Sequence, residues 1–146
     1  MRISVFNSKE LQGTILLVRN SPREVAKEIR QRTKAVVGPA WQEAINAATR
    51  TRVQQLVIAD TARVSVSDQN VTLSAGSVGR ALSGGAKPVE LIVGAEFGSN
   101  RYKQFGVRVS KGKVFYPAVA TVIPRIAALW IATTVRTFYE ILERGR

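Results

Sequence analysis

The apolar residues of this 146-residue chain change their spacing near Ala62, and this change determines the fold class that we predict. Before Ala62 they recur at the helical period of about 3.6 residues. After it they alternate with polar residues about a turn at residues 68–70, which predicts a β-hairpin with one buried face: Val64, Val66, Val71 and Leu73. The helical period returns at Pro117. Helices, a small antiparallel sheet and a final helix together predict an α+β fold.

The first part of the chain predicts a short strand at residues 2–6 and a helix at Lys9–Arg19 that Gly13 weakens. The run Ser21-Pro22-Arg23-Glu24 predicts the start of a longer helix. There serine would cap the helix, proline would take the first helical position, and glutamate would complete a capping box. Gly38-Pro39 predicts a kink or an interruption, after which a second helix runs to about residue 50.

The second part predicts a loop rich in glycine and serine at residues 76–88 and a strand at residues 88–97. A second hairpin would pair residues 102–109 with residues 113–116, and a long helix would occupy residues 117–143. We predict one domain over residues 1–146. It comprises an N-terminal segment (1–20), helices (21–58), a sheet with the loop and a basic arm (62–116), and the C-terminal helix (117–143).

The residue types exclude several kinds of chemistry. The chain has no cysteine and no histidine, so it lacks thiolates, the usual acid–base group at neutral pH and the commonest metal ligand. We therefore expect no cofactor and no metal. The formal net charge of +12 predicts a negatively charged partner, such as DNA, RNA, anionic lipid or an acidic protein surface.

The sequence gives no sign of export or membrane insertion. The longest apolar run covers residues 126–132, whereas a membrane span needs about 20 apolar residues. The N-terminal residues show no secretory signal. We expect a soluble protein that is made inside the cell and has no membrane partner.

The loop at residues 76–88 contains glycines and a lysine, as phosphate-binding loops do. It lacks the spacing of that motif, because Lys87 is followed by Pro88 rather than by serine or threonine. We expect it to connect strands, so that no helix N-terminus would receive a phosphate.

Glu96 stands alone among small residues and is the one tempting catalytic carboxylate. Its nearest acidic neighbour, Glu90, would lie about 20 Å away on the predicted strand, which is too far for shared proton chemistry. We favour a structural role for Glu96, either pairing with an arginine or accepting backbone N–H groups near a turn. The spacing of Asp60 and Asp68 does not point to a metal site.

Two groups of residues are predicted to make contacts. Trp41 and the apolar stripe of the last helix are expected to anchor the core or an interface. The stripe covers most of the helix circumference, so we expect a neighbouring subunit against Ile126, Leu129, Trp130 and Ile131. The basic arm carries five cations with no acid between them, and glycines at positions 106 and 112. Its expected contacts with a partner protein or DNA phosphates are Arg101, Tyr102, Lys103, Phe105, Arg108, Lys111 and Lys113.

Two motifs resemble the tail-completion, or head–tail joining, family of long-tailed bacteriophages. The first is Ala95-Glu96-Phe97-Gly98-Ser99, and the second is Val114-Phe115-Tyr116-Pro117-Ala118, which opens the last helix. The order and length of the elements fit this family over roughly residues 20–143, but residues 49–62 depart from its pattern. The resemblance implies structural roles for Glu96, Phe97, Gly98, Phe115, Tyr116 and Pro117.

The resemblance further implies a virion protein assembled in the host cytoplasm. It would form a ring at the neck, a hexamer or possibly a dodecamer, between the head connector and the tail tube or terminator, with viral DNA passing through. Two other classes stay open from the residues themselves. One is a small basic nucleic-acid-binding protein, and the other is an enzyme that works through Glu96. We expect no enzymatic activity, because the usual catalytic residue types are missing.

Overall fold

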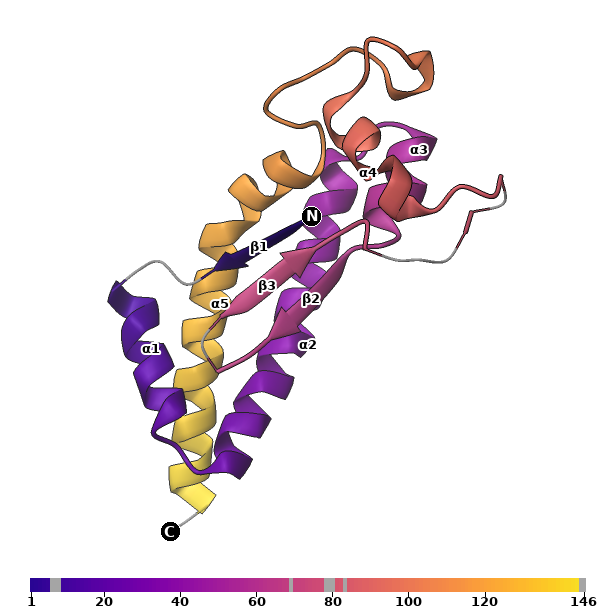
Figure 1. Ribbon diagram of the computed structural model, residues 1–146. Helices are drawn as coiled ribbons and strands as arrows, with labels where there is room; N and C mark the ends of the chain where they lie inside the picture. The colour runs from indigo at the N-terminus through magenta and orange to yellow at the C-terminus, as the bar shows by residue number, and fades with distance from the viewer. Residues whose placement is uncertain (6–8, 69, 78–80, 83, 145–146) are drawn as a thin grey trace.

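Two long antiparallel helices lying side by side support the rest of the molecule. The computed structural model describes residues 1–5, 9–68, 70–77, 81–82 and 84–144. Helix α2 (Arg23–Ala48) and helix α5 (Phe115–Arg144) contact each other along much of their length (Figure 1). Helix α1 (Lys9–Arg19) packs against the end of this pair where α2 begins and α5 ends.

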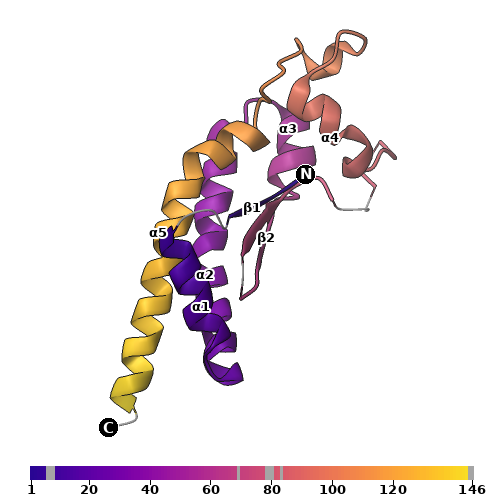
Figure 2. The same cartoon turned by 60° about the vertical axis from the view of Figure 1, so that its left-hand side comes forward.

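A three-stranded antiparallel sheet lies across the helix pair, as Figures 1 and 2 show. Strand β3 (Val71–Ser74) is central, between β1 (Arg2–Val5) and β2 (Arg63–Val66). Val71 and Leu73 are fully buried, whereas the residues between and after them are half-buried, as the alternating pattern predicts. The hairpin, the short first strand and the α+β class are therefore confirmed. Phe6 and Gln69 lie outside the described residues.

The predicted interruption at Gly38-Pro39 is wrong, because α2 continues through Pro39. Pro39 lies on the exposed side of the helix, so water can satisfy the carbonyl that proline leaves without an N–H donor. Its neighbours Val37, Ala40 and Trp41 are buried in the core and hold this part of the helix in place.

The predicted capping box at the start of α2 is also wrong. Pro22 is the N-cap residue, and no side chain caps the helix. The Ser21 hydroxyl instead donates to the carbonyl oxygen of Leu17, 2.5 Å away at the end of α1. Because Ser21 lies only two residues after the end of α1 at Arg19, its hydroxyl satisfies the last turn of that helix rather than the first turn of the next.

Residues 88–97 form helix α4 (Pro88–Phe97) and not the predicted strand. The start signals are present in the sequence. Pro88 occupies the first turn, and a Glu90 carboxylate oxygen accepts the backbone N–H of Lys87 at 3.1 Å. The sequence pattern of residues 88–97 shows no helical period, because both faces of α4 carry aliphatic residues and the apolar run is therefore continuous. The loop before it thus leads into a helix, contrary to our expectation.

The region predicted to hold helices (21–58) continues beyond α2 as two further helical pieces, whose form the sequence did not predict. Residues 49–62 contain a capped helical turn, α3 (Arg52–Gln54), and the π-helical η1 (Gln55–Ala59), whose Val57, Ile58 and Ala59 are fully buried. The basic arm is not a β-hairpin. It is an irregular loop with a short 3-10 turn, η2 (Lys103–Phe105), and projects at one end of the molecule (Figure 1).

The core lies where α2, α5, η1, α4 and the sheet meet. Trp41 and Trp130 are 1% exposed, so of the two predicted alternatives, core or interface, both lie in the core. The Trp41 ring meets Phe115 edge to face with a centroid distance of 5.5 Å.

We predict that Ile126→Ala lowers the free energy of unfolding by about 2–5 kcal/mol, because it opens a cavity in this core. Val135→Ala on the exposed side of the same helix should cost less than about 1 kcal/mol. Urea unfolding of both variants tests this, and equal losses would contradict the assigned burial.

Candidate functional site: a buried carboxylate and the loop it supports

The Glu96 carboxylate caps the N-terminus of α5. It is fully buried, and its Oε2 accepts the backbone N–H groups of Val114 at 3.1 Å and Phe115 at 2.7 Å. Its Oε1 accepts the N–H of Tyr116 at 3.0 Å. These are N–H groups that a helix leaves without partners at its start, and the helix dipole favours a negative charge there. The carboxylate acts as the cap although it lies 18 to 20 residues earlier in the chain.

This geometry supports a structural role for Glu96 rather than acid–base chemistry. Both carboxylate oxygens are engaged by backbone donors, and the side chain is closed off from a substrate. Glu90 lies on the exposed part of the same helix and binds the backbone of Lys87. Among the described residues, no three acidic side chains gather to hold a metal ion.

Gly112 makes room for the cap. A Cβ atom at this position would lie 2.2 Å from Glu96 Oε1, and the residue has a φ of +86°. Both the close approach and the positive φ require glycine. From the sequence alone, Gly112 is one of two glycines of the basic arm and has no assigned role. Its role depends on a contact with Glu96, which the local sequence does not reveal.

The basic loop, residues 98–112, is tied at its base to the end of α4. The N–H of Val109 donates to the Phe97 carbonyl oxygen at 2.7 Å, and the N–H of Lys113 donates to the Glu96 carbonyl oxygen at 2.8 Å. Gly98 has a φ of +75°, and a Cβ there would lie 2.3 Å from the Val107 carbonyl oxygen. The motif around Glu96 therefore forms both the helix cap and the base of the loop.

Two of the residues predicted to contact a partner also hold the loop together. The Lys113 ammonium donates to the Phe105 carbonyl oxygen at 2.7 Å, and Lys113 is half-buried. The Phe105 ring lies so close to Gly94 of α4 that a Cβ at Gly94 would be 2.6 Å away. The other predicted contact residues are exposed on the loop surface: Arg101, Tyr102, Lys103, Arg108 and Lys111.

The aromatic motif at the start of α5 joins the cap to the core. Phe115 is fully buried, and Tyr116 contacts the rings of both Phe115 and Phe97, with centroid distances of 5.3 and 5.8 Å. Pro117 is exposed in the first turn of α5, where a missing N–H costs nothing. The helix begins at Phe115, two residues before the predicted start.

Helix α5 has two apolar faces. The inner face includes Ile126 and Trp130, which are 0% and 1% exposed within this chain. These two residues cannot form the subunit contact that the sequence predicted, because α2 and the rest of the core already cover them; Leu129 and Ile131 are half-buried. The outer face is exposed at helical spacing: Pro117, Thr121, Pro124, Ala128, Ala132, Val135, Tyr139 and Leu142.

In length and composition α5 would also suffice to cross a membrane, with a mean hydropathy of 1.7 over its most apolar window. A third of that window is buried inside the molecule. A core helix with a second apolar face satisfies the same criterion, so this property alone does not identify a membrane span.

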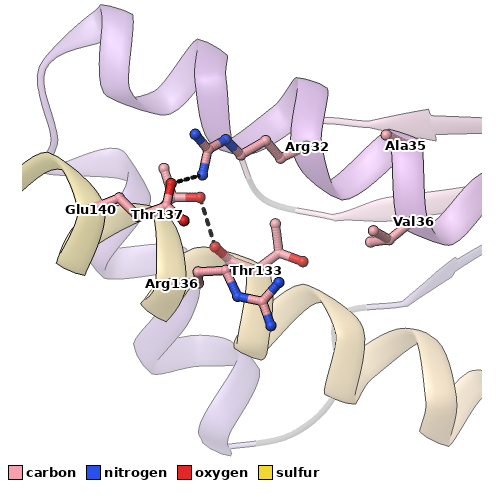
Figure 3. Close-up of a pocket in the computed structure, with 7 residues that line it drawn as sticks. All are labelled: Arg32, Ala35, Val36, Thr133, Arg136, Thr137 and Glu140. Atoms are coloured by element: carbon pink, nitrogen blue, oxygen red, sulfur yellow. Dashed lines mark hydrogen bonds and ion pairs between the residues drawn. The ribbon is translucent and has the colours of Figure 1, made fainter.

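A shallow pocket lies between α2 and α5, near the end where α1 packs (Figure 3). Arg32 on α2 donates to Glu140 on α5 and to Glu28 on its own helix. The hydrogen bond from Arg32 is the main cause that lowers the pKa of Glu140 below its usual value of 4.5, and the same bond raises the pKa of Arg32. This ion pair bridges the two long helices.

Comparison with protein-family models, with curated proteins and with solved structures finds no match for this chain.

We predict that Glu96→Gln lowers the free energy of unfolding by about 2–3 kcal/mol. The glutamine side chain has no negative charge to place at the helix N-terminus. Its NH2 group replaces one carboxylate oxygen, so a hydrogen-bond donor would face backbone N–H donors. Thermal and urea unfolding measure the loss. Glu90→Gln, which alters an exposed carboxylate on the same helix, is the matched control and should change stability by less than about 1 kcal/mol. Unchanged stability of Glu96→Gln would contradict the capping role.

We predict that the contribution of Glu140 to stability disappears in acid. Because the pKa of Glu140 is lowered in the folded state, the ion pair stabilises the fold above the unfolded-state value near 4.5 and is lost as the pH falls through the folded value. Glu140→Gln should therefore be less stable than the unmodified chain at neutral pH and should approach it at an acid pH well below 4.5. Unfolding at both pH values tests this, with Glu143→Gln as the control. A gap that persists in acid would argue against the ion pair as its cause.

Proposed function

We propose that this chain is a non-enzymatic structural protein that assembles with copies of itself and joins the head to the tail of a long-tailed bacteriophage. The observation that carries the proposal is the contact between the two motifs of the family resemblance. The Glu96 carboxylate of the first motif accepts the N–H groups of Val114, Phe115 and Tyr116 in the second. Two segments that resemble one family separately thus form one structural unit.

The outer face of α5 supports assembly with further copies. It extends over 25 residue intervals from Pro117 to Leu142, or about 37 Å along the helix at the usual rise of 1.5 Å. Val135, Tyr139 and Leu142 are 45%, 66% and 66% exposed. An apolar strip of this length in solvent is typical of a surface that another protein covers. In a ring, each copy would present such a face to its neighbour.

The position of the basic loop supports a joining role. The loop projects at the end of the molecule where α5 begins, while α5, which carries the outer face, runs along the length of the molecule (Figure 1). One surface is thus available for neighbouring copies, and a separate one for a different partner. In a neck ring that different partner would be the head connector or the tail tube or terminator.

The main alternative is a small basic DNA-binding protein, which the exposed cations of the loop support. Such a protein should bind duplex DNA with an affinity that falls steeply and linearly on a log–log plot against salt concentration. A joining protein that only lets DNA pass should bind it weakly at physiological salt.

The biological test is to remove the chain from the phage that encodes it. We expect filled heads and separate tails by electron microscopy, and restoration of joined particles when the chain is supplied again. Joined, infectious particles without the chain would overturn the proposal.

We predict that Val135→Gln with Leu142→Gln converts the assembled protein into monomers while it stays folded, because glutamine suits an exposed helix position but removes apolar contact area. Light scattering over a range of concentrations measures the mass, and circular dichroism measures the helix content. The control variant is Val89→Gln with Val93→Gln on α4, where these valines are 52% and 63% exposed. It also replaces two exposed aliphatic residues by glutamine and should leave assembly unaffected. An unmodified chain that is monomeric at every concentration would refute assembly through this face.

A further inference from the structure

We propose that the basic loop is a docking surface for an acidic protein with apolar side chains among its carboxylates, and that this protein is not another copy of the chain. The inference rests on the proposed joining function, since a joining protein needs a second, different partner. It is carried by the loop's geometry, by its charge and by its exposed apolar residues.

The loop is built as a defined surface. In addition to the bonds at its base, the N–H of Ser99 donates to the Gly106 carbonyl oxygen at 3.1 Å, and Ser99 Oγ accepts the N–H groups of Arg101 and Tyr102, both at 3.1 Å. The Phe105 ring is seated against Gly94. A loop held by this many internal bonds loses less conformational entropy when it binds than a disordered arm would.

The loop presents positive charge that the chain itself does not neutralise. Four of its cations are exposed: Arg101, Lys103, Arg108 and Lys111. The ion pairs found within the described part of the chain all involve other arginines. Arg101 lies over the ring of Tyr102, with 5.3 Å between its guanidinium carbon and the ring centroid. These charges are therefore available to a partner.

A second copy of the chain is a poor partner for this charge. Glu28, Glu43, Asp68 and Glu140 already form ion pairs, and Glu96 is buried. The exposed Glu24 and Glu143, near the start of α2 and the end of α5, lie at the opposite end of the molecule from the loop and are next in sequence to Arg23 and Arg144. Asp60 and Glu90 are also exposed, but each already accepts a hydrogen bond within the chain, from the Gln55 amide and from the Lys87 backbone N–H. With a net charge of +12, two copies brought together by this loop would repel each other.

The apolar residues of the loop favour protein over nucleic acid. Val107 is 81% exposed and Val109 is 38% exposed, beside Arg108. Phosphates give no reason to expose aliphatic side chains, because they bind cations and hydrogen-bond donors, and a valine side chain is neither. A protein surface can pair carboxylates with Arg108 and Lys111 and bury the valines at the same time. Tyr102, half exposed, adds an aromatic contact of the kind enriched at protein interfaces.

The test is fluorescence anisotropy on the full chain with three labelled probes. The probes are a peptide that combines glutamates with leucines, a peptide of equal charge with serines in place of the leucines, and a short DNA duplex. We expect the glutamate–leucine peptide to bind tightest. Val107→Ser should weaken the binding of the glutamate–leucine peptide about tenfold and leave the binding of the serine-containing peptide and of the DNA duplex unchanged.

Arg108→Glu with Lys111→Glu should weaken the binding of both peptides by at least about tenfold. The matched control is Arg23→Glu with Lys27→Glu, the same charge change at exposed positions of the opposite end, which should alter binding by less than about threefold. Circular dichroism checks that all variants are folded; Lys113 is left intact because it holds the loop.

Three results would overturn the proposal. Tightest binding of the DNA duplex with no effect of Val107→Ser would identify a phosphate surface. Equal losses in the loop and control variants would mean that only net charge matters. Absence of binding to all three probes would mean that the loop is merely solvated. None of these results depends on whether the chain assembles with itself, so failure here is distinguishable from failure of the proposed function.

Discussion

The interaction on which the functional half of the structure depends is the Glu96 carboxylate bound to the first N–H groups of α5. It removes several unsatisfied donors from a buried helix start, and it places a negative charge where the helix dipole favours one. Through its main chain the same residue fixes Lys113, and its neighbour Phe97 fixes Val109. One side chain and two carbonyl groups thus set where α4 ends, where the basic loop projects and where α5 begins.

The pair of long helices gives this arrangement its support. Helix α5 contributes its inner face to the core with α2, η1 and the sheet, and ion pairs such as Arg125 with Glu43 bridge it to α2 at the surface. Because the inner face is already covered, we assign contact with other molecules to the outer face and to the loop. The two surfaces differ in chemistry, since one is apolar and the other combines cations with valines. This difference is why we assign them to different partners.

The sequence allowed part of this to be predicted from local pattern. Alternation of valine and leucine identified the hairpin, and helical spacing identified α1, α2 and α5. The wrong predictions have separate physical causes. Residues 88–97 are aliphatic on all sides, so their periodicity is ambiguous, and Gly38-Pro39 breaks a helix only where packing does not hold it. Ile126 and Trp130 appeared to be excess apolar surface because the sequence does not show how much of α5 the core will cover.

The sequence by itself determined the charge, the absence of cysteine and histidine chemistry, and the alternation of helix and sheet, because these follow from residue types and short-range spacing. It also identified Glu96 as more plausible in a structural role than in catalysis. Only the tertiary structure decided which atoms Glu96 binds, why residue 112 must be glycine, and that Phe105 and Lys113 hold the loop together. Those facts depend on contacts between residues that are far apart in the chain, and no local pattern encodes such contacts.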